Sequence, residues 1–245
     1  MLLIGLCGLG NSAVAQKALQ DWSLEEVLGA IESANGGLNV IEATTNIRVR
    51  GSVDTGDLTY EFLLLKKRPD KMRIKMMFKG RSMETGFNGL TGWRRTSQGE
   101  RDEIVEMSAS EFAQANLDVD FDGPLIGPPM AGVERRLMGV ERFERVDYFV
   151  IEVRGQSLVT RHYIDSRTFR EWKTIRETVD DSGQPFETVT QYADYRRLGS
   201  IWLAYEVEKR YPGGRIEKIS IESAELDPGL LDQVFDVPRN WMEGS

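Results

Sequence analysis

Three aspartates occupy alternate positions near the middle of the chain, the arrangement that begins a calcium-binding loop. Asp118, Asp120 and Asp122 are followed by Gly123, as in the loop of an EF-hand. Such a loop also needs a bidentate carboxylate at its twelfth position, which here is Pro129. We therefore expect no calcium at this segment and predict instead the exit of a helix, with its aspartates facing water.

The residue types that most often perform covalent or metal chemistry are scarce. The sequence of 245 residues has one cysteine, Cys7, and one histidine, His162. It therefore has no Cys/His metal cluster and makes no positive case for a Ser-His-Asp site. It also has no G-x-S-x-G motif and no glycine-rich phosphate loop after a strand. We expect no enzyme, no cofactor and no metal, with His162 in a structural role.

The charge balance argues against one class of partner. The net charge is −8, and a surface of that sign repels phosphate backbones. We therefore expect no nucleic acid as the main partner and no electrostatic docking on anionic lipid.

The first residues have the pattern of a secretory signal peptide. An apolar run from Leu2 to Leu9 is followed by Ala13-Val14-Ala15, an A-x-A cleavage site. We predict a signal peptide over 1–15, a mature chain from Gln16, and a periplasmic, exported protein. The alternative is a buried N-terminal helix. The remaining residues, 16–245, are expected to form a single domain.

The sequence predicts two helices. Ser23 and Glu26 form a capping box ahead of a helical apolar pattern that ends at Gly36-Gly37. A second helix is predicted from Ser108 or Ser110, followed by an apolar Gly/Pro-rich loop. Among the residues that follow this second helix, we expect Phe121, Leu125 and Ile126 to face inward.

Most of the remaining sequence predicts antiparallel strands. β-Branched segments alternate with short turns such as Arg68-Pro69-Asp70 and Asn88-Gly89. The segment "NVIEATTNIRVRGSV" is predicted to be one of these strands. Strands joined by such short turns cannot be parallel. We predict a mainly β fold: one long, curved antiparallel sheet forming an incomplete barrel covered by helices.

One predicted strand carries a stripe of large apolar residues. Met72, Ile74, Met76 and Phe78 alternate with Arg73, Lys75 and Lys79, and so share a face of the sheet. Such a stripe is either ordinary core or the wall of a lipid cavity, because flexible methionines suit variable apolar shapes. We predict lipid-binding roles for the stripe and for residues on other strands, namely Leu64, Trp172 and Tyr205.

Segments along most of the chain resemble the LolA/LolB family of outer-membrane lipoprotein carriers. The residues that carry the resemblance are "GAIESANGGLNVIEATTNIRVRGSV", "KKRPDKMRIKM", "FNGLTGWRR", "FDGPLIG", "QYADYRRLGSIWLAYEVEKRY" and "VFDVP". The resemblance implies an incomplete antiparallel barrel around helices, with an apolar cavity. It also implies a periplasmic carrier of lipoprotein acyl chains or similar lipid, without cofactor or catalysis. Membrane-bound donor and acceptor proteins and a monomeric state are implied as well.

The resemblance gives one residue a specific role. Arg68 matches the arginine that closes the carrier's helical lid by hydrogen bonds to backbone carbonyls, and a guanidinium offers the donors for this. The alternative is a surface arginine at a turn. Whether 108–132 forms a different lid is left open. A second hypothesis is a scaffold or envelope-stress module of the RseB-like type, which binds a protein partner and senses lipid.

Overall fold

The computed structural model describes residues 17–108, 111, 121–155, 158–179 and 184–238. The predicted signal peptide lies outside these residues, as do Asp118, Asp120 and most of the helix predicted from Ser108. Within the described residues, no helix has both the length and the apolar character needed to cross a membrane.

Helical structure is concentrated at the N-terminal end of the described chain. α1 (Leu24–Ala34) begins at the predicted capping box, in which Ser23 and Glu26 exchange hydrogen bonds. α2 (Leu38–Ala43) follows after two glycines. The short 3-10 turns are η1 (Leu19–Asp21), η2 (Pro212–Gly214) and η3 (Asp232–Val234).

The strands of the described chain form one antiparallel sheet of thirteen, in the order β6-β5-β4-β3-β2-β1-β13-β12-β11-β10-β9-β8-β7. The first meander comprises β1 (Asn46–Asp54), β2 (Thr59–Lys67), β3 (Lys71–Phe78), β4 (Arg81–Phe87), β5 (Gly92–Gln98) and β6 (Arg101–Glu106). The second comprises β7 (Glu134–Phe143), β8 (Val146–Arg154), β9 (Val159–Asp165), β10 (Glu171–Val179), β11 (Pro185–Leu198), β12 (Ile201–Arg210) and β13 (Ile216–Leu226). The pairing of β1 with β13 joins the two meanders.

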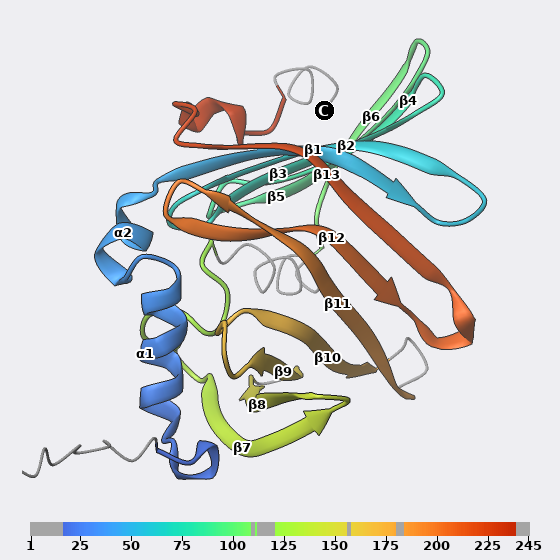
Figure 1. Ribbon diagram of the computed structural model, residues 1–245. Coiled ribbons are helices and arrows are strands. Elements are labelled where there is room, and N and C mark those ends of the chain that lie inside the picture. Colours follow the sequence, from blue (N-terminus) through green and yellow to red (C-terminus); the bar gives the residue numbers. More distant parts are fainter. Residues whose placement is uncertain (1–16, 109–110, 112–120, 156–157, 180–183, 239–245) are drawn as a thin grey trace, which may run out of the picture.

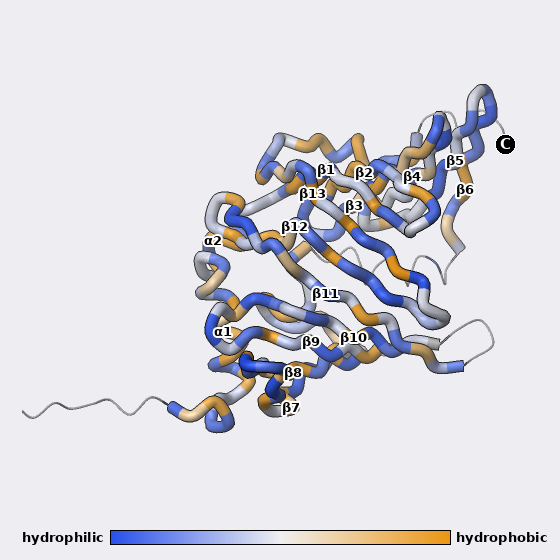
Figure 2. The backbone as a smooth tube through the Cα atoms, turned by 45° about the vertical axis from the view of Figure 1, so that its right-hand side comes forward, coloured by the Kyte–Doolittle hydropathy of each residue, from blue (hydrophilic) through white to orange (hydrophobic). Residues whose placement is uncertain are grey.

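The sheet curves strongly but does not close, because β6 and β7 are its two edges. Its halves bend toward each other, and α1 and α2 lie at the open side (Figure 1). Figure 2 shows hydrophobic and hydrophilic residues interspersed along the strands, as expected of a sheet whose two faces differ. The predicted fold class, a long curved antiparallel sheet forming an incomplete barrel with helical cover, is confirmed.

Three local predictions were wrong or incomplete. Residues 39–43 were predicted to start a strand, but they belong to α2. Gly37 starts this helix with a φ of 89°, and Arg68 binds the carbonyl oxygens of Ile41 and Thr44 at its end. Tertiary contacts thus override the β-branched composition. β6 and β7 were not predicted.

The concave face of the second meander carries the largest buried cluster. Val27 and Ile31 of α1 pack against Phe149 and Ile151 of β8 and Ile164 of β9. All five are almost completely buried. This packing docks α1 across the open side of the sheet.

The C-terminal segment covers the opposite, convex face of the first meander (Figure 1). Phe235 is fully buried, and it packs with Leu230 against Leu65 of β2. The backbone of this segment is also bound: Trp93 Nε1 donates to the Phe235 carbonyl at 3.1 Å, and Arg73 Nη1 donates to the Val234 carbonyl at 2.9 Å. The convex face of the first meander is therefore covered by this segment, and its other face belongs to the concave side of the sheet.

Glu84 is the buried counter-ion beneath this cover. Its side chain is 2% exposed, and its carboxylate lies 2.5 Å from Arg73 Nη2 and 3.1 Å from Lys75 Nζ. Burial by itself raises the pKa of Glu84, but the hydrogen bonds from Arg73 and Lys75 outweigh it and lower the pKa below its ordinary value of 4.5. Glu84 is therefore charged in the folded protein at neutral pH.

Replacing Glu84 should make the fold less stable and less sensitive to acid. A carboxyl group whose pKa is lower in the folded state stabilises above its unfolded pKa, and this stability is lost as the pH falls through the folded pKa. We expect Glu84→Gln to lower the free energy of unfolding by about 2 kcal/mol at pH 7. Urea unfolding at several pH values should show the difference shrinking below pH ~4.5.

Glu225→Gln is the matched control, because Glu225 pairs with Arg48 on the protein surface. Exposed ion pairs contribute little, so this variant should unfold almost as the wild type does. Equal unfolding curves for Glu84→Gln and Glu225→Gln would contradict the role given to Glu84.

Candidate functional site

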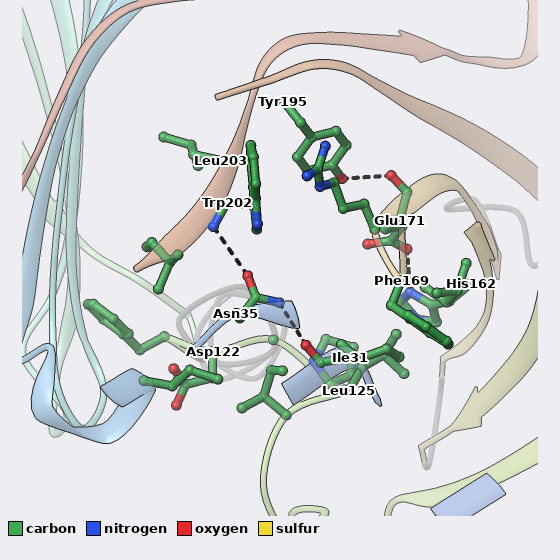
Figure 3. Close-up of a pocket in the computed structure, with 18 of the residues that line it drawn as sticks. Ile31, Asn35, Asp122, Leu125, His162, Phe169, Glu171, Tyr195, Trp202 and Leu203 are labelled. Atoms are coloured by element: carbon green, nitrogen blue, oxygen red, sulfur yellow. Dashed lines mark hydrogen bonds and ion pairs between the residues drawn. The ribbon is translucent and has the colours of Figure 1, made fainter. Parts of the chain in front are cut away.

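The described structure contains a cavity of about 330 Å³ on the concave side of the sheet. It lies between the two α-helices, the start of β1, the loop 121–126 and β9 to β12, and Figure 3 shows how side chains from these elements converge on it. The apolar side chains of its wall include Ile31, Ile41, Ile47, Phe121, Leu125, Ile126, Ile164, Phe169, Ile201 and Leu203. This size and lining are typical of a small-molecule binding site.

The loop 121–126 forms one wall of the cavity and is anchored to the core. Leu125 is buried in the cluster that α1 makes with β8, and Ile126 packs at its edge. Just beyond, the Gly127 amide donates to Glu32 of α1 at 3.0 Å, and Arg135 Nη1 donates to the Gly127 carbonyl at 2.7 Å. The loop thus lies against α1 and screens the cavity.

Arg68 binds this loop to α2. It follows β2 directly, and its guanidinium donates from Nε to the Thr44 carbonyl at 2.6 Å and from Nη2 to the Ile41 carbonyl at 2.8 Å. The same guanidinium pairs with both carboxylate oxygens of Asp122 and lies 4.5 Å from the centre of the Phe121 ring. One side chain therefore joins two elements that line the cavity.

The surroundings of Asp122 correct one prediction. We expected the aspartates of this segment to face water, but the Asp122 side chain is only 20% exposed and is paired with Arg68. Leu125 and Ile126 do face inward, as predicted. The predicted hydrogen bonds from Arg68 to backbone carbonyls are present, whereas its action as a lid latch stays a prediction.

One wall of the cavity is polar. His162 Nδ1 lies 2.6 Å from Glu171 Oε1, and His162 Nε2 lies 2.8 Å from Thr160 Oγ1. The hydroxyl of Thr174 donates to Glu171 as well, and Tyr195 Oη donates to the Glu171 carbonyl at 2.6 Å. Burial first, and then the charge of Glu171, raises the pKa of Tyr195, which keeps the phenol neutral.

This polar chain has the order hydroxyl, imidazole, carboxylate, but it does not present a nucleophile to the cavity. Among the described residues, Thr160 is not one of those that line the cavity, and it is almost completely buried. Both nitrogens of His162 already have partners. The arrangement satisfies a buried histidine, in agreement with the structural role expected for it.

None of the seven residues predicted to bind lipid lines this cavity. Strand register places five of them on the same face of the sheet as Ile47, which does line it. Leu64 pairs with both Val49 and Ile74, and Val49 lies two residues from Ile47. The five residues on this face are Leu64, Met72, Ile74, Met76 and Phe78. They are half-buried, so they form an apolar surface beside the cavity.

The other two predicted residues lie elsewhere. Trp172 sits at a register shift in β10 and stacks on Tyr148 at 4.5 Å between ring centroids. Tyr148 precedes Phe149, which belongs to the concave core, so Trp172 lies on the convex face. The ring of Tyr205 lies 4.3 Å from the Arg196 guanidinium. Lipid binding at Trp172 and Tyr205 stays a prediction.

The sequence analysis missed most of the polar and aromatic residues of the cavity wall, among them Asn35, Tyr195 and Trp202. Trp202 and Tyr195 lie on neighbouring strands, and the Trp202 amide donates to Asn35 Oδ1 at 3.2 Å (Figure 3). Asn35 also donates to the Ile31 carbonyl at 3.0 Å, which ends α1. Tyr195 and Trp202 fall within the segment "QYADYRRLGSIW", which carried the family resemblance, but their direction could not be read from it.

Solved structures of other proteins share this arrangement. A LolA superfamily protein from Nitrosomonas europaea matches with a TM-score of 0.59 and 14% identity, over 88% of this chain and 98% of its own. The chain has a LolA-like fold. A domain described as outer membrane lipoprotein-sorting, from Vibrio parahaemolyticus, matches this LolA-like fold with a TM-score of 0.59 and 13% identity, over 87% and 96% of the two chains.

A DUF1329 family protein from Desulfovibrio piger matches equally well, with a TM-score of 0.59 and 13% identity, over 85% of this chain and 97% of its own. No family model matches the sequence, and no curated protein matches it significantly. Structural likeness at such low sequence identity establishes the LolA-like fold that the sequence motifs predicted. It says nothing about the ligand.

The contact between Arg68 and Asp122 should be measurable as an energetic coupling. Both side chains are about one-fifth exposed, so their charge-assisted hydrogen bonds are poorly screened by water. We expect Arg68→Ala and Asp122→Ala each to lower the free energy of unfolding, and the double variant to cost roughly 1–2 kcal/mol less than their sum. Urea unfolding of the four proteins gives this value.

The matched control cycle uses Arg136 and Glu134, whose side chains are about two-thirds exposed. Their coupling should be close to zero. Hydrogen exchange should also accelerate in 121–127 of Arg68→Ala. A coupling no larger than that of the control pair would contradict the role of Arg68 in holding the loop.

Proposed function

We propose that this protein is a periplasmic carrier or chaperone that binds lipoprotein acyl chains, or similar lipids, for transport to the outer membrane. The observation that carries the proposal is the apolar cavity on the concave face, one wall of which is a loop that Arg68 ties to α2. The likeness to a domain described as lipoprotein-sorting supports it at the level of the fold.

The energetics favour an acyl chain as the ligand. Each buried methylene group contributes about 0.8 kcal/mol, so about ten methylenes in contact with apolar walls contribute roughly 8 kcal/mol before the cost of immobilising the chain. The half-buried stripe from Leu64 to Phe78 lies on the same side of the sheet as the cavity. A chain longer than the cavity would extend along this stripe and cover it.

Loading requires that the loop 121–126 move away from α2. The hydrogen bonds of Arg68 hold it in place, and water can replace each of them when they break. Arg68 therefore acts in our proposal as the latch predicted from the sequence. A latch made of hydrogen bonds opens more readily than a packed interface, because its partners remain solvated after release.

The proposal includes the cellular setting expected from the sequence. Residues 1–15 would be removed during export, and 16–245 would act in the periplasm as one lipid-binding domain. Membrane-bound donor and acceptor proteins would load and unload the carrier. No bond is made or broken in this function, and no cofactor is needed.

Lipid should accompany the purified protein. We expect a chain that starts at Gln16, purified without detergent, to show a native mass equal to one protein plus one lipid or acylated peptide. Organic extraction then identifies the bound class. A clean apo mass, together with failure to take up a fluorescent acyl probe, would contradict the carrier and favour the alternative module that binds a protein partner.

Acidic substitutions should separate the cavity from the stripe. Leu203 lines the cavity, and Met76 lies on the stripe. A carboxylate in an apolar wall must be desolvated by the acyl chain, so Leu203→Asp and Met76→Asp should weaken binding of the acyl probe by at least about tenfold. Met138→Asp is the control, because Met138 is exposed on β7.

Thermal unfolding of the three variants shows whether the fold is retained. Weaker binding by Leu203→Asp alone would confine the ligand to the cavity. Undiminished binding by both Leu203→Asp and Met76→Asp would contradict the proposed site.

A further inference from the structure

One arginine lines the cavity among the described residues, and its environment differs from that of Arg68 nearby. Arg170 lines the cavity just before β10. Its guanidinium carbon lies 3.4 Å from the centre of the Trp202 ring and 5.9 Å from that of Tyr195. The aromatic rings thus hold the flat face of the guanidinium, as favourable cation–π geometry requires.

Within the described residues, no carboxylate or carbonyl accepts a hydrogen bond from the Arg170 guanidinium. Its Nε is shielded from solvent and has no partner there. Arg68, in contrast, uses all of its nitrogens on Asp122 and the carbonyls of Ile41 and Thr44. A charged donor that is shielded from water and has no acceptor raises the free energy of the folded protein. A ligand that supplies an acceptor to Arg170 would remove this cost.

The carboxylates that line the cavity are engaged by other groups. Asp122 is paired with Arg68. Glu171 follows Arg170 in sequence, but its Oε1 accepts from Thr174 and lies 2.6 Å from His162 Nδ1. Arg170 is therefore the cation of the described cavity wall that lacks a bound counter-ion.

A ligand that satisfies Arg170 must carry anionic oxygens. Because the face of the guanidinium is stacked on Trp202, its N–H edge is the part free to bind, and that edge matches the spacing of two oxygens in a carboxylate or phosphate. The remaining wall, formed by side chains such as Leu125 and Ile164, suits an acyl chain.

We propose that the cavity takes an anionic amphiphile, with its carboxylate or phosphate head group on Arg170 and its acyl chain against the apolar wall. This inference rests on the proposed lipid-binding function and adds a head-group site to it. A fatty acid and a phospholipid share this chemistry.

Matched lipids test the head-group site. Hexadecanoate, hexadecyl phosphate and hexadecanol share one chain length and differ in charge, and their affinities can be measured by displacement of a fluorescent acyl probe. We expect the wild type to bind at least one of the anions about tenfold or more tightly than hexadecanol, as hydrogen bonds to charged groups imply. The order of the two anions then tells a fatty acid from a phosphate-bearing lipid.

Arg170→Gln should remove this preference, because it should weaken binding of the anions about tenfold more than binding of hexadecanol. Arg196→Gln is the matched control: Arg196 also lies over an aromatic ring, that of Tyr205, but it is paired with Asp194 and does not line the cavity. Arg170→Lys keeps the charge without the planar fork, so it should retain the preference in part. It also serves as the test variant if Arg170→Gln fails to fold.

The outcomes separate this inference from the proposed function. If the wild type and Arg170→Gln bind anionic and neutral lipids equally, the head-group site is overturned and the carrier proposal stands. If the wild type binds none of the three lipids, both fail. If inorganic phosphate displaces hexadecyl phosphate at equal concentration, the hydrocarbon chain contributes no affinity. The proposal of an amphiphilic ligand is then overturned.

Discussion

A long antiparallel sheet that curves without closing leaves an apolar face that other elements must cover, and most of this structure follows from that constraint. The edges β6 and β7 do not pair with each other, and the loop 121–126 and the helices before β1 lie at the open side. Val27 and Ile31 of α1 pack against the buried residues of β8 and β9 on this face. Farther along the same face the cover is incomplete, and the apolar walls that remain enclose the cavity. The cavity is thus a consequence of the architecture.

The two faces of the sheet are covered by different kinds of interaction. On the convex face, Phe235 is fully buried and its carbonyl accepts from Trp93, so this cover can leave only if the core opens. On the concave face, the loop 121–126 is tied to α2 through the hydrogen bonds of Arg68, which water can replace. The same loop is anchored in the core by Leu125, so the link that our proposal releases is the one through Arg68. Arg170 adds a positive charge to the otherwise largely apolar wall of the cavity. The charge and the apolar wall together favour an anionic amphiphile as the ligand.

Much of the fold could be predicted because its signals are local. The capping box at Ser23 and the turn at Asn88-Gly89 depend on side chains within a few residues of each other, and the structure contains both. The strands from β8 to β13 are rich in β-branched and aromatic residues between short turns, and the sequence predicted them. α2 was mistaken for a strand because its conformation depends on Arg68, which is distant in sequence. β6 and β7 escaped prediction because their charged residues obscure the alternation.

For the candidate site, the sequence by itself determined which strand carries an apolar stripe and that Arg68, with donors suited to backbone carbonyls, precedes this strand. Tertiary structure alone decided what those residues meet. A register shift at Trp172 turns this ring to the convex face, whereas Trp202 enters the cavity wall, although both are tryptophans on predicted strands. One residue of register reverses the face of a strand, and no local signal records it. The pairing of Arg68 with Asp122, fifty-four residues apart, depends likewise on how the sheet brings its two meanders together.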